Sequence, residues 1–303
     1  MAPLVRVNAP QPFLRGFCPA VREIWAYREL LGSLVTKELK VKYKNSFLGF
    51  LWSLLRPLCL LMIYWLVLGK FLRSNIPDYA FYLFAGLVAW DLFGSTVTAA
   101  TGSIVNNAGL IKKVYFPREI LPLATVGAGL VHFALQLLVM FGVLLAFQYD
   151  FFGANLLLVV LAIIPLVAFL TAISLLVAAA NVFLRDVQHL VEVLMLFWFW
   201  LTPIVYPIAF AFDVFKERAI LGVKLSTIYL LNPMANIVLA FQRGIYKRLS
   251  APDDNGNLVK VLYQASVGTY LGRLVAVTLF SLVLVWFAQR MFARVQGNFA
   301  QEL

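Results

Sequence analysis

The sequence predicts an all-α membrane protein with six transmembrane helices, an N-terminal amphipathic interface helix, and two short re-entrant helices between the fifth and sixth spans. Composition carries the class: of 303 residues, 62% are hydrophobic and only 13% charged, with a mean hydropathy of +0.88. A soluble core needs far less apolar sequence. The apolar residues also form runs long enough to cross a bilayer, separated by short polar or basic stretches.

The net formal charge is +11, from 25 Lys and Arg against 14 Asp and Glu. These cations lie between apolar runs, so we interpret them as setting membrane orientation and contacting anionic lipid, not as a nucleic-acid surface. Cys18 and Cys59 are too few and too far apart for a disulfide framework or a metal cluster. Residues 1–20 have no continuous apolar segment, so we expect no cleavable signal peptide and insertion directed by the internal spans.

Over residues 1–46 the sequence predicts a cytoplasmic arm followed by the interface helix. Prolines favour an irregular arm over the first 20 residues. From residue 21 to residue 44, apolar residues recur at three- and four-residue steps with basic residues between them. This pattern is typical of a helix in the headgroup plane whose lysines face anionic lipid. The alternative, a helix packed on a soluble cytoplasmic domain, lacks such a domain in the sequence.

The transmembrane region is expected over residues 47–292, with a cytoplasmic tail at 293–303. The spans are predicted near 47–71, 79–105, 121–147, 156–184, 187–208 and 266–290. Arg56 in the first span should reach the headgroups or an aqueous path, because a charge facing lipid costs a few kcal/mol.

Two sets of small or polar residues within the spans have structural interpretations. Gly94, Thr98 and Gly102 share one helix face at four-residue spacing, which favours close helix packing. His132 and Gln136 are one turn apart on the third span. We interpret them as an interhelical hydrogen-bonding pair, because a proton relay would need further titratable partners along the path.

A re-entrant gate is predicted at residues 203–241. Pro203 and Pro207 break the helix while their neighbours remain apolar, so this backbone must be buried in protein or line a cavity. The next apolar piece, interrupted by Asn232 and Pro233, is about fourteen residues long and too short to cross a bilayer. We expect these four residues to mark a gate on one membrane face.

Orientation follows from the basic residues. With six spans, those before the first span, in residues 106–120 and after the last span fall on one side, which is then cytoplasmic. One set of basic residues falls on the other side. Either re-entrant segments follow the orientation rule only weakly, or a span has been missed. The set is Lys216, Arg218, Lys224, Arg243, Lys247, Arg248 and Lys260.

Residues 106–122, NNAGLIKKVYFPREILP, form a compact cationic interruption between two apolar runs. An ordinary loop whose cations fix topology is one interpretation. The apolar and aromatic centre of Val114, Tyr115 and Phe116 within a basic rim is, however, typical of a small helix that docks into a protein groove.

The sequence lacks the residue patterns that several other functions would require. The only Gly-Lys pair, at 69–70, is not followed by Ser or Thr, so the chain cannot bind ATP through a P-loop. Asp91 and Glu192 are nearly the only acids within the spans, which is little for an ion-coupled pump. His189 and Glu192 have the spacing of metal ligands but no further ligands to complete a site. The two halves show no convincing hydropathy repeat, which disfavours inverted-repeat transporters.

Six motifs follow one another along the chain: KVKYKNSFLGFLWSLLRP, FAGLVAWDLF, NNAGLIKKVYFPREILP, NVFLRDV, LTPIVYP and LLNPM. In this order, over about residues 20–292, they resemble the ABC-2 type permeases of bacterial polysaccharide exporters. Such permeases, the Wzm type among them, export lipid-linked O-antigen, teichoic acid or galactan. The resemblance implies a homodimer in the bacterial inner membrane, with both termini cytoplasmic. It also implies no catalysis and no cofactor in this chain, and two copies of a separate ATPase that binds ATP and Mg.

The resemblance further implies that residues 107–118 insert into a cleft of the ATPase, with the preceding basic helix nearby, and that residues 203–234 are periplasmic gate helices. The coupling residues would be Asn107, Lys112, Lys113, Val114, Tyr115, Phe116 and Arg118. Two positions depart from the family pattern, where we expect uncharged residues. Asp91 and Arg56 occupy these positions, and each is a candidate for a substrate contact specific to this chain.

A sugar polymer must slide without being trapped, and aromatic faces hold sugars weakly at many places. The candidate conduit residues are Trp52, Trp65, Trp90, Asp91, Phe93, Phe197, Trp198, Trp200 and Tyr206. Trp and Tyr also collect at membrane interfaces regardless of function. A lipid pyrophosphate head would need cations at the cytoplasmic entrance. The candidates for that role are Lys40, Lys42, Lys44 and Arg56.

Two other functions stay open. An ion-coupled secondary transporter or channel would conduct without an ATPase, driven by a gradient. A membrane-embedded glycosyl or lipid transferase would need a catalytic acid facing the interface, for which Asp91 and Glu192 are the candidates.

Overall fold

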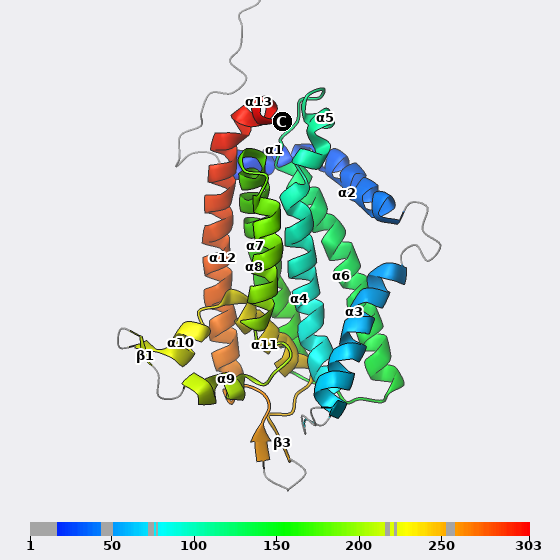
Figure 1. Cartoon of the computed structure of the whole chain (residues 1–303), viewed down its shortest axis with the longest axis vertical. Helices are drawn as coiled ribbons and strands as arrows, with labels where there is room; N and C mark the ends of the chain where they lie inside the picture. The colour runs from blue at the N-terminus through cyan, green and yellow to red at the C-terminus, as the bar shows by residue number, and fades with distance from the viewer. Residues whose placement is uncertain are drawn as a thin grey trace, which may run out of the picture.

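The computed structural model describes residues 17–43, 51–71, 76, 78–215, 219–220, 223–252 and 258–303, which form a bundle of long helices (Figure 1). Within these residues four helices are long and apolar enough to cross a membrane. They are α4 (Tyr79–Gly102), α6 (Ile120–Ala146), α7 (Leu156–Phe183) and α12 (Val267–Val295). They coincide with four predicted spans, so the helical membrane class is confirmed.

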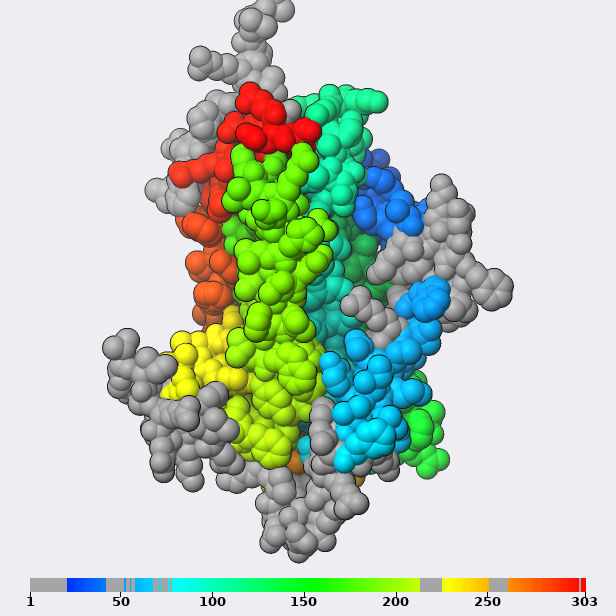
Figure 2. Space-filling view, in the orientation of Figure 1, coloured from blue at the N-terminus to red at the C-terminus, as the bar shows by residue number. Residues whose placement is uncertain are grey.

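Two shorter apolar helices occupy the predicted first and fifth spans. α3 (Leu51–Tyr64) continues into the π-helical turn η1 (Trp65–Phe71) and packs against α4. α8 (Val187–Trp200) packs against α4 and α7. Figure 2 shows α8 running along the visible face of the bundle with α3 beside its lower half.

One end of the bundle carries α1 (Phe17–Ala26), α2 (Arg28–Tyr43), η2 (Val105–Asn107) and α5 (Ala108–Ile111). Beside them the chain leaves α12 through η3 (Gln296–Asn298) and ends in α13 (Phe299–Glu302), as Figure 1 shows. The first described helix and the C-terminal end therefore lie at the same end of the bundle, here called the α5 end.

The opposite end carries α9 (Ile208–Phe215), α10 (Leu225–Tyr229) and two short antiparallel strand pairs (Figure 1). The pairs are β1 (Ala219–Ile220) with β2 (Val223–Lys224), and β3 (Ser250–Pro252) with β4 (Leu258–Lys260). These two- and three-residue pairs are minor additions, and the described residues otherwise keep the predicted helical class.

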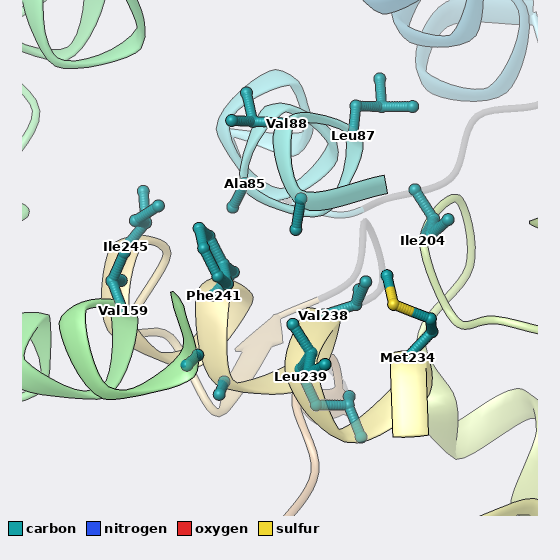
Figure 3. Packing of buried hydrophobic residues seen from close by; sticks show 14 of the residues in the cluster. Ala85, Leu87, Val88, Val159, Ile204, Met234, Val238, Leu239, Phe241 and Ile245 are labelled. Atoms are coloured by element: carbon teal, nitrogen blue, oxygen red, sulfur yellow. The ribbon is translucent and has the colours of Figure 1, made fainter. Parts of the chain in front are cut away.

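α11 (Pro233–Ile245) is buried along nearly its whole length against α4, α7 and α12. Asn232 starts it: the side chain accepts a hydrogen bond from the Met234 amide at 3.1 Å, and Pro233 occupies the first turn, where its missing N–H does no harm. Figure 3 shows Val238 and Phe241 of α11 lying toward α4.

The predicted packing face of the second span has a different role. Gly94 and Thr98 line a cavity, whereas the close approach of helices occurs elsewhere. A Cβ atom on Gly129 of α6 would lie 2.2 Å from Thr96 Oγ1 of α4. A Cβ atom on Gly244 of α11 would lie 3.0 Å from the carbonyl oxygen of Asn155. The prediction found the right helix but not the residues in closest contact, because spacing along one helix does not identify its neighbours.

Two basic residues at the opposite end of the bundle, here called the α9 end, are paired with acids. Arg248 lies 2.7 Å from Asp78, just before α4, and Lys247 lies 3.1 Å from Asp150, in the turn between α6 and α7. The two pairs join three chain segments, and they neutralise part of the charge that the orientation rule leaves on this side. Lys216 and Arg218 lie outside the described residues.

Candidate functional site

The predicted coupling segment, residues 106–120, comprises the end of η2, all of α5 and the loop up to the first residue of α6, at the α5 end of the bundle (Figure 1). Its first turn is tied to the body of the protein. Asn107 is buried, its Oδ1 accepts a hydrogen bond from Lys37 Nζ of α2 at 2.6 Å, and its Nδ2 donates to the Ser103 carbonyl at 2.8 Å. Asn107 therefore connects the interface helix to the segment.

The tip of the segment is exposed and basic. Lys112 and Lys113 are exposed, as are Val114 and Tyr115, the last with 65% of its surface accessible. These residues border a hollow of about 240 Å³ formed by the segment itself. An apolar and aromatic tip with two free-standing cations beside it fits a groove that has an apolar floor and an acidic rim.

Phe116 does not share this surface. It is only 5% exposed and belongs to a buried cluster with Leu34, Ile111 and Ile120. The expectation that it would form one exposed face with Val114 and Tyr115 is wrong, because the chain turns between Tyr115 and Pro117. Phe116 instead holds the segment against α2 and α6.

The end of the segment is tied to the other side of the bundle. The Arg118 guanidinium donates to the Gln296 carbonyl and lies 5.9 Å from the ring centre of Phe299. Glu119 is buried, and its Oε1 accepts from Gln289 Nε2 of α12 at 3.4 Å. Burial raises the pKa of Glu119 from 4.5 to about 7.

A cavity of about 600 Å³ opens between α3, α4 and α8. Two predicted conduit residues, Trp90 and Asp91, line it. Its wall also includes the polar groups of Ser95, Thr98 and Glu192, and the rings of Tyr64 and Phe199. Phe199 is stacked on Tyr64 at 5.9 Å and meets Trp90 edge-on at 5.6 Å. Aromatic faces beside hydrogen-bonding groups are suited to a polyhydroxylated ligand.

Asp91 is held in place by Gln136. Gln136 Nε2 on α6 donates to Asp91 Oδ2 at 2.7 Å. His132 and Gln136 were expected to act as an interhelical pair, and for Gln136 the partner across the helices is this carboxylate. One Asp91 oxygen is thus committed to α6, while the residue still borders the cavity.

A second cavity, of about 740 Å³, lies on the other side of α8 and is almost wholly apolar. Phe197 and Trp198 line it together with residues of α7 and α10. Phe93 borders neither cavity. It is fully buried, stacked on Phe169 at 5.4 Å and edge-on to Trp198 at 5.2 Å, so its packing is that of a core residue.

The remaining conduit candidates are spread over the surface. Trp52 and Trp65 lie exposed along α3 and η1, and Trp200 is exposed at the end of α8. Tyr206 donates to the Trp200 carbonyl at 2.7 Å and lies 3.0 Å from the hydroxyl of Tyr229. These residues do not form one lining within a single chain.

Asn232, one of the four predicted gate residues, contacts the chain just before Pro203. Asn232 Oδ1, besides capping α11, accepts from Trp198 Nε1 at 3.0 Å, and its Nδ2 donates to Thr202 Oγ1 at 3.3 Å. Pro203 and Pro207 are buried, as the sequence argument required of this broken backbone. Asn232 therefore joins the two proline-marked segments.

Gln242 provides a hydrogen-bond donor for backbone carbonyls in the chain interrupted by Pro203 and Pro207. Its buried Nε2 donates to the carbonyl oxygen of Pro203 at 3.0 Å and to that of Ile204 at 3.4 Å. The sequence argument did not identify this residue, nor Glu119. For Gln242, a polar side chain in an apolar helix was the available signal.

Of the predicted lipid-head residues, Lys40 is exposed on α2. Lys44 and the side chains of Lys42 and Arg56 lie outside the described residues. His189 Nδ1 and Glu192 Oε2 are 3.9 Å apart on α8. Within the described part of the chain, no three His, Cys, Asp or Glu side chains are grouped as metal ligands would be.

Comparison of the sequence with known proteins assigns the chain to a family. The profile of the ABC-2 type transporter family matches residues 29–246, more than half of the chain. The O-antigen export system permease protein RfbA of Myxococcus xanthus is 33% identical over 284 residues, covering 93% of this chain and 98% of the relative. An RfbA of Klebsiella pneumoniae is 34% identical over 219 residues, covering 71% and 79%. The polysialic acid transport protein KpsM of Escherichia coli is 26% identical over 183 residues, covering 58% and 69%. The chain is a member of the ABC-2 type transporter family.

Proposed function

We propose that this chain is the transmembrane permease subunit of an ATP-driven exporter of a lipid-linked polysaccharide of the O-antigen, teichoic acid or galactan type. ATP and Mg would be bound by a separate ATPase, in two copies, and this chain would be non-catalytic. The observation that carries the proposal is the exposed basic and aromatic tip at Lys112–Tyr115, held by buried contacts on both sides.

The tip has the properties of a coupling element. Its flanks are fixed to α2 through Asn107 and to α12 through Glu119, so a displacement of the tip reaches two different parts of the bundle. The chain has no P-loop of its own, so the force must come from outside it. Lys112 and Lys113 would meet acids at the rim of the ATPase groove, and Tyr115 its apolar floor.

The glycan path would include the cavity between α3, α4 and α8. Asp91, Ser95 and Thr98 offer hydrogen-bond acceptors and donors for sugar hydroxyls, and Trp90 offers a stacking face. A second copy of the chain, placed against the exposed apolar side chains of α8, would enclose this path in a homodimer. The surface aromatics Trp52, Trp65, Phe197, Trp200 and Tyr206 would then complete the lining.

In this arrangement the α5 end is cytoplasmic, both termini included, and the α9 end is periplasmic, in a bacterial inner membrane. α3 and α8 would be the first and fifth of six spans. The residues joined by Asn232 would form the gate on the outer face. Lys40 of α2, with Lys42, Lys44 and Arg56, would receive the pyrophosphate head of the lipid carrier.

Reconstitution tests the proposal. The purified chain alone should hydrolyse no ATP, and proteoliposomes that also contain the ATPase encoded beside it should export lipid-linked glycan only with ATP. Substitution of Lys112 and Lys113 by Gln should lower the affinity for the ATPase while the protein remains folded. Hydrolysis by the chain alone, or gradient-driven flux without an ATPase, would refute the assignment.

A further inference from the structure

The segment after α12 folds back onto the bundle at the α5 end. Phe299 of α13 is fully buried, and its ring meets Phe292 edge-on at 5.3 Å and Phe183 at 5.9 Å. Leu303 packs against the same cluster. Residues 296–302 are therefore docked on the ends of α7 and α12, beside the coupling segment (Figure 1).

Arg118 bridges the coupling segment and this docked region. Its guanidinium donates to the backbone carbonyl of Gln296 and faces the Phe299 ring at a distance within reach of a cation–π contact. Arg118 is half-buried, and desolvation lowers its pKa, whereas Lys112 and Lys113 are exposed. Its planar fork suits a carbonyl and an aromatic face at the same time, which a Lys ammonium cannot reproduce.

The neighbouring residue adds a second bridge to the same side. Glu119 accepts from Gln289, which lies in the last two turns of α12. The chain from Phe116 to Glu119 thus touches α2, α12, η3 and α13, whereas the four residues before it, 112–115, are exposed. The direction in which those four residues project depends on these inward contacts.

We propose that residues 296–302 form a positioning platform for the coupling segment, with Arg118 acting inward through the Gln296 carbonyl and Phe299 to set where residues 112–115 are presented. Arg118 is then a positioning residue and not a contact of the ATPase, although it lies within the segment that the family resemblance assigns to coupling. A test that measures binding of the ATPase rests on the proposed function, whereas a test on the purified permease alone does not.

The first test is amide hydrogen exchange on the purified full-length permease without the ATPase. Arg118→Lys and Phe299→Leu should each speed exchange of residues 112–118 roughly fivefold or more, because both loosen the local anchor. Gln296→Ala is a matched control, since the backbone carbonyl remains, and should leave exchange unchanged. Phe287→Leu, which alters an aromatic side chain of α12 that is 44% exposed, is a second control. Unchanged exchange in both test variants overturns the proposal.

The second test is a double-mutant cycle on the dissociation constant for the ATPase. If Arg118 acts through the docked region, Arg118→Ala should weaken binding in the wild-type background and weaken it clearly less in the Phe299→Leu background. Fully additive effects would mean that Arg118 contacts the ATPase directly, and would overturn the proposal. Failure of any ATPase to bind would refute the proposed function while leaving the exchange result to decide on the platform.

Discussion

Tyr115 and Phe116 are adjacent aromatic residues for which the structure implies opposite consequences of substitution. Tyr115 is 65% exposed at the tip, whereas Phe116 is 5% exposed within the cluster that joins α2, α5 and α6. Truncation of Phe116 to Ala removes a buried ring and should destabilise the fold by about 3–5 kcal/mol. Truncation of Tyr115 to Ala should change stability by no more than about 0.5 kcal/mol, because the ring has few contacts to lose.

Binding to the ATPase should reverse this order. A buried aromatic anchor at an interface contributes about 2 kcal/mol or more, so Tyr115→Ala should raise the dissociation constant roughly 30-fold. Phe152→Ala is the matched control: this side chain is 64% exposed in the turn between α6 and α7, at the opposite end of the bundle. It should leave binding unchanged.

The assays are thermal unfolding in detergent and titration of the ATPase onto reconstituted permease. In export measurements the ATPase reconstituted with the Tyr115→Ala permease should hydrolyse ATP with little glycan moved, while Phe116→Ala should yield little folded protein. Two results would refute the reasoning: a Tyr115→Ala protein as unstable as Phe116→Ala, or a Tyr115→Ala protein with unchanged ATPase affinity and export.

Three further substitutions test other contacts. Asp91→Ala should lower the thermal midpoint by the equivalent of about 1–3 kcal/mol because it leaves the Gln136 amide unpaired, and Asp91→Asn should lower it less; equal effects would contradict the 2.7 Å contact. Asn232→Ala should cost about 0.5–2 kcal/mol as a lost helix cap, measured as a thermal shift that Asn232→Asp largely avoids. The raised pKa of Glu119, about 7, means that the folded state binds the proton more tightly, so stability is greatest below pH 4.5 and falls as the pH rises towards 7. Across that range the free energy of unfolding of the wild type should fall by about 3 kcal/mol, and Glu119→Gln should abolish this fall, as measured by thermal unfolding at each pH. Identical pH profiles for the wild type and Glu119→Gln would exclude a contribution from Glu119.

The fold was largely predictable because hydropathy and helix length are local properties. Four long helices lie within a few residues of the predicted spans, and the burial of Pro203 and Pro207 followed from the need to satisfy a broken backbone. The strand pairs were not foreseen. Each is only two or three residues long, too short for alternation of polar and apolar residues to appear.

The candidate site was predictable as a segment but not as a set of side-chain directions. Polarity identified residues 106–122, yet it gave no means of separating Tyr115 from Phe116, because the turn after Tyr115 depends on contacts with α2. The partners of Asp91 and Arg118 are 45 and 178 residues away in sequence, beyond any pattern in a single chain. Contacts of that range are fixed by how helices assemble, which one sequence does not specify residue by residue.

The burial of α11 also constrains how the protein is made. A helix of 13 residues cannot cross a bilayer, and its buried Gln242 donates to two carbonyl oxygens in the chain between α8 and α9. α11 therefore has no stable place in lipid until α4 and α7 offer a surface and the turn after α8 has formed. During synthesis α11 can therefore dock only after those helices have assembled. α12, which follows α11 in the chain, then packs against α7 and covers α11. Docking of α11 and insertion of α12 are thus expected to be the last steps of assembly, and defects in Gln242 should appear first as failed biogenesis.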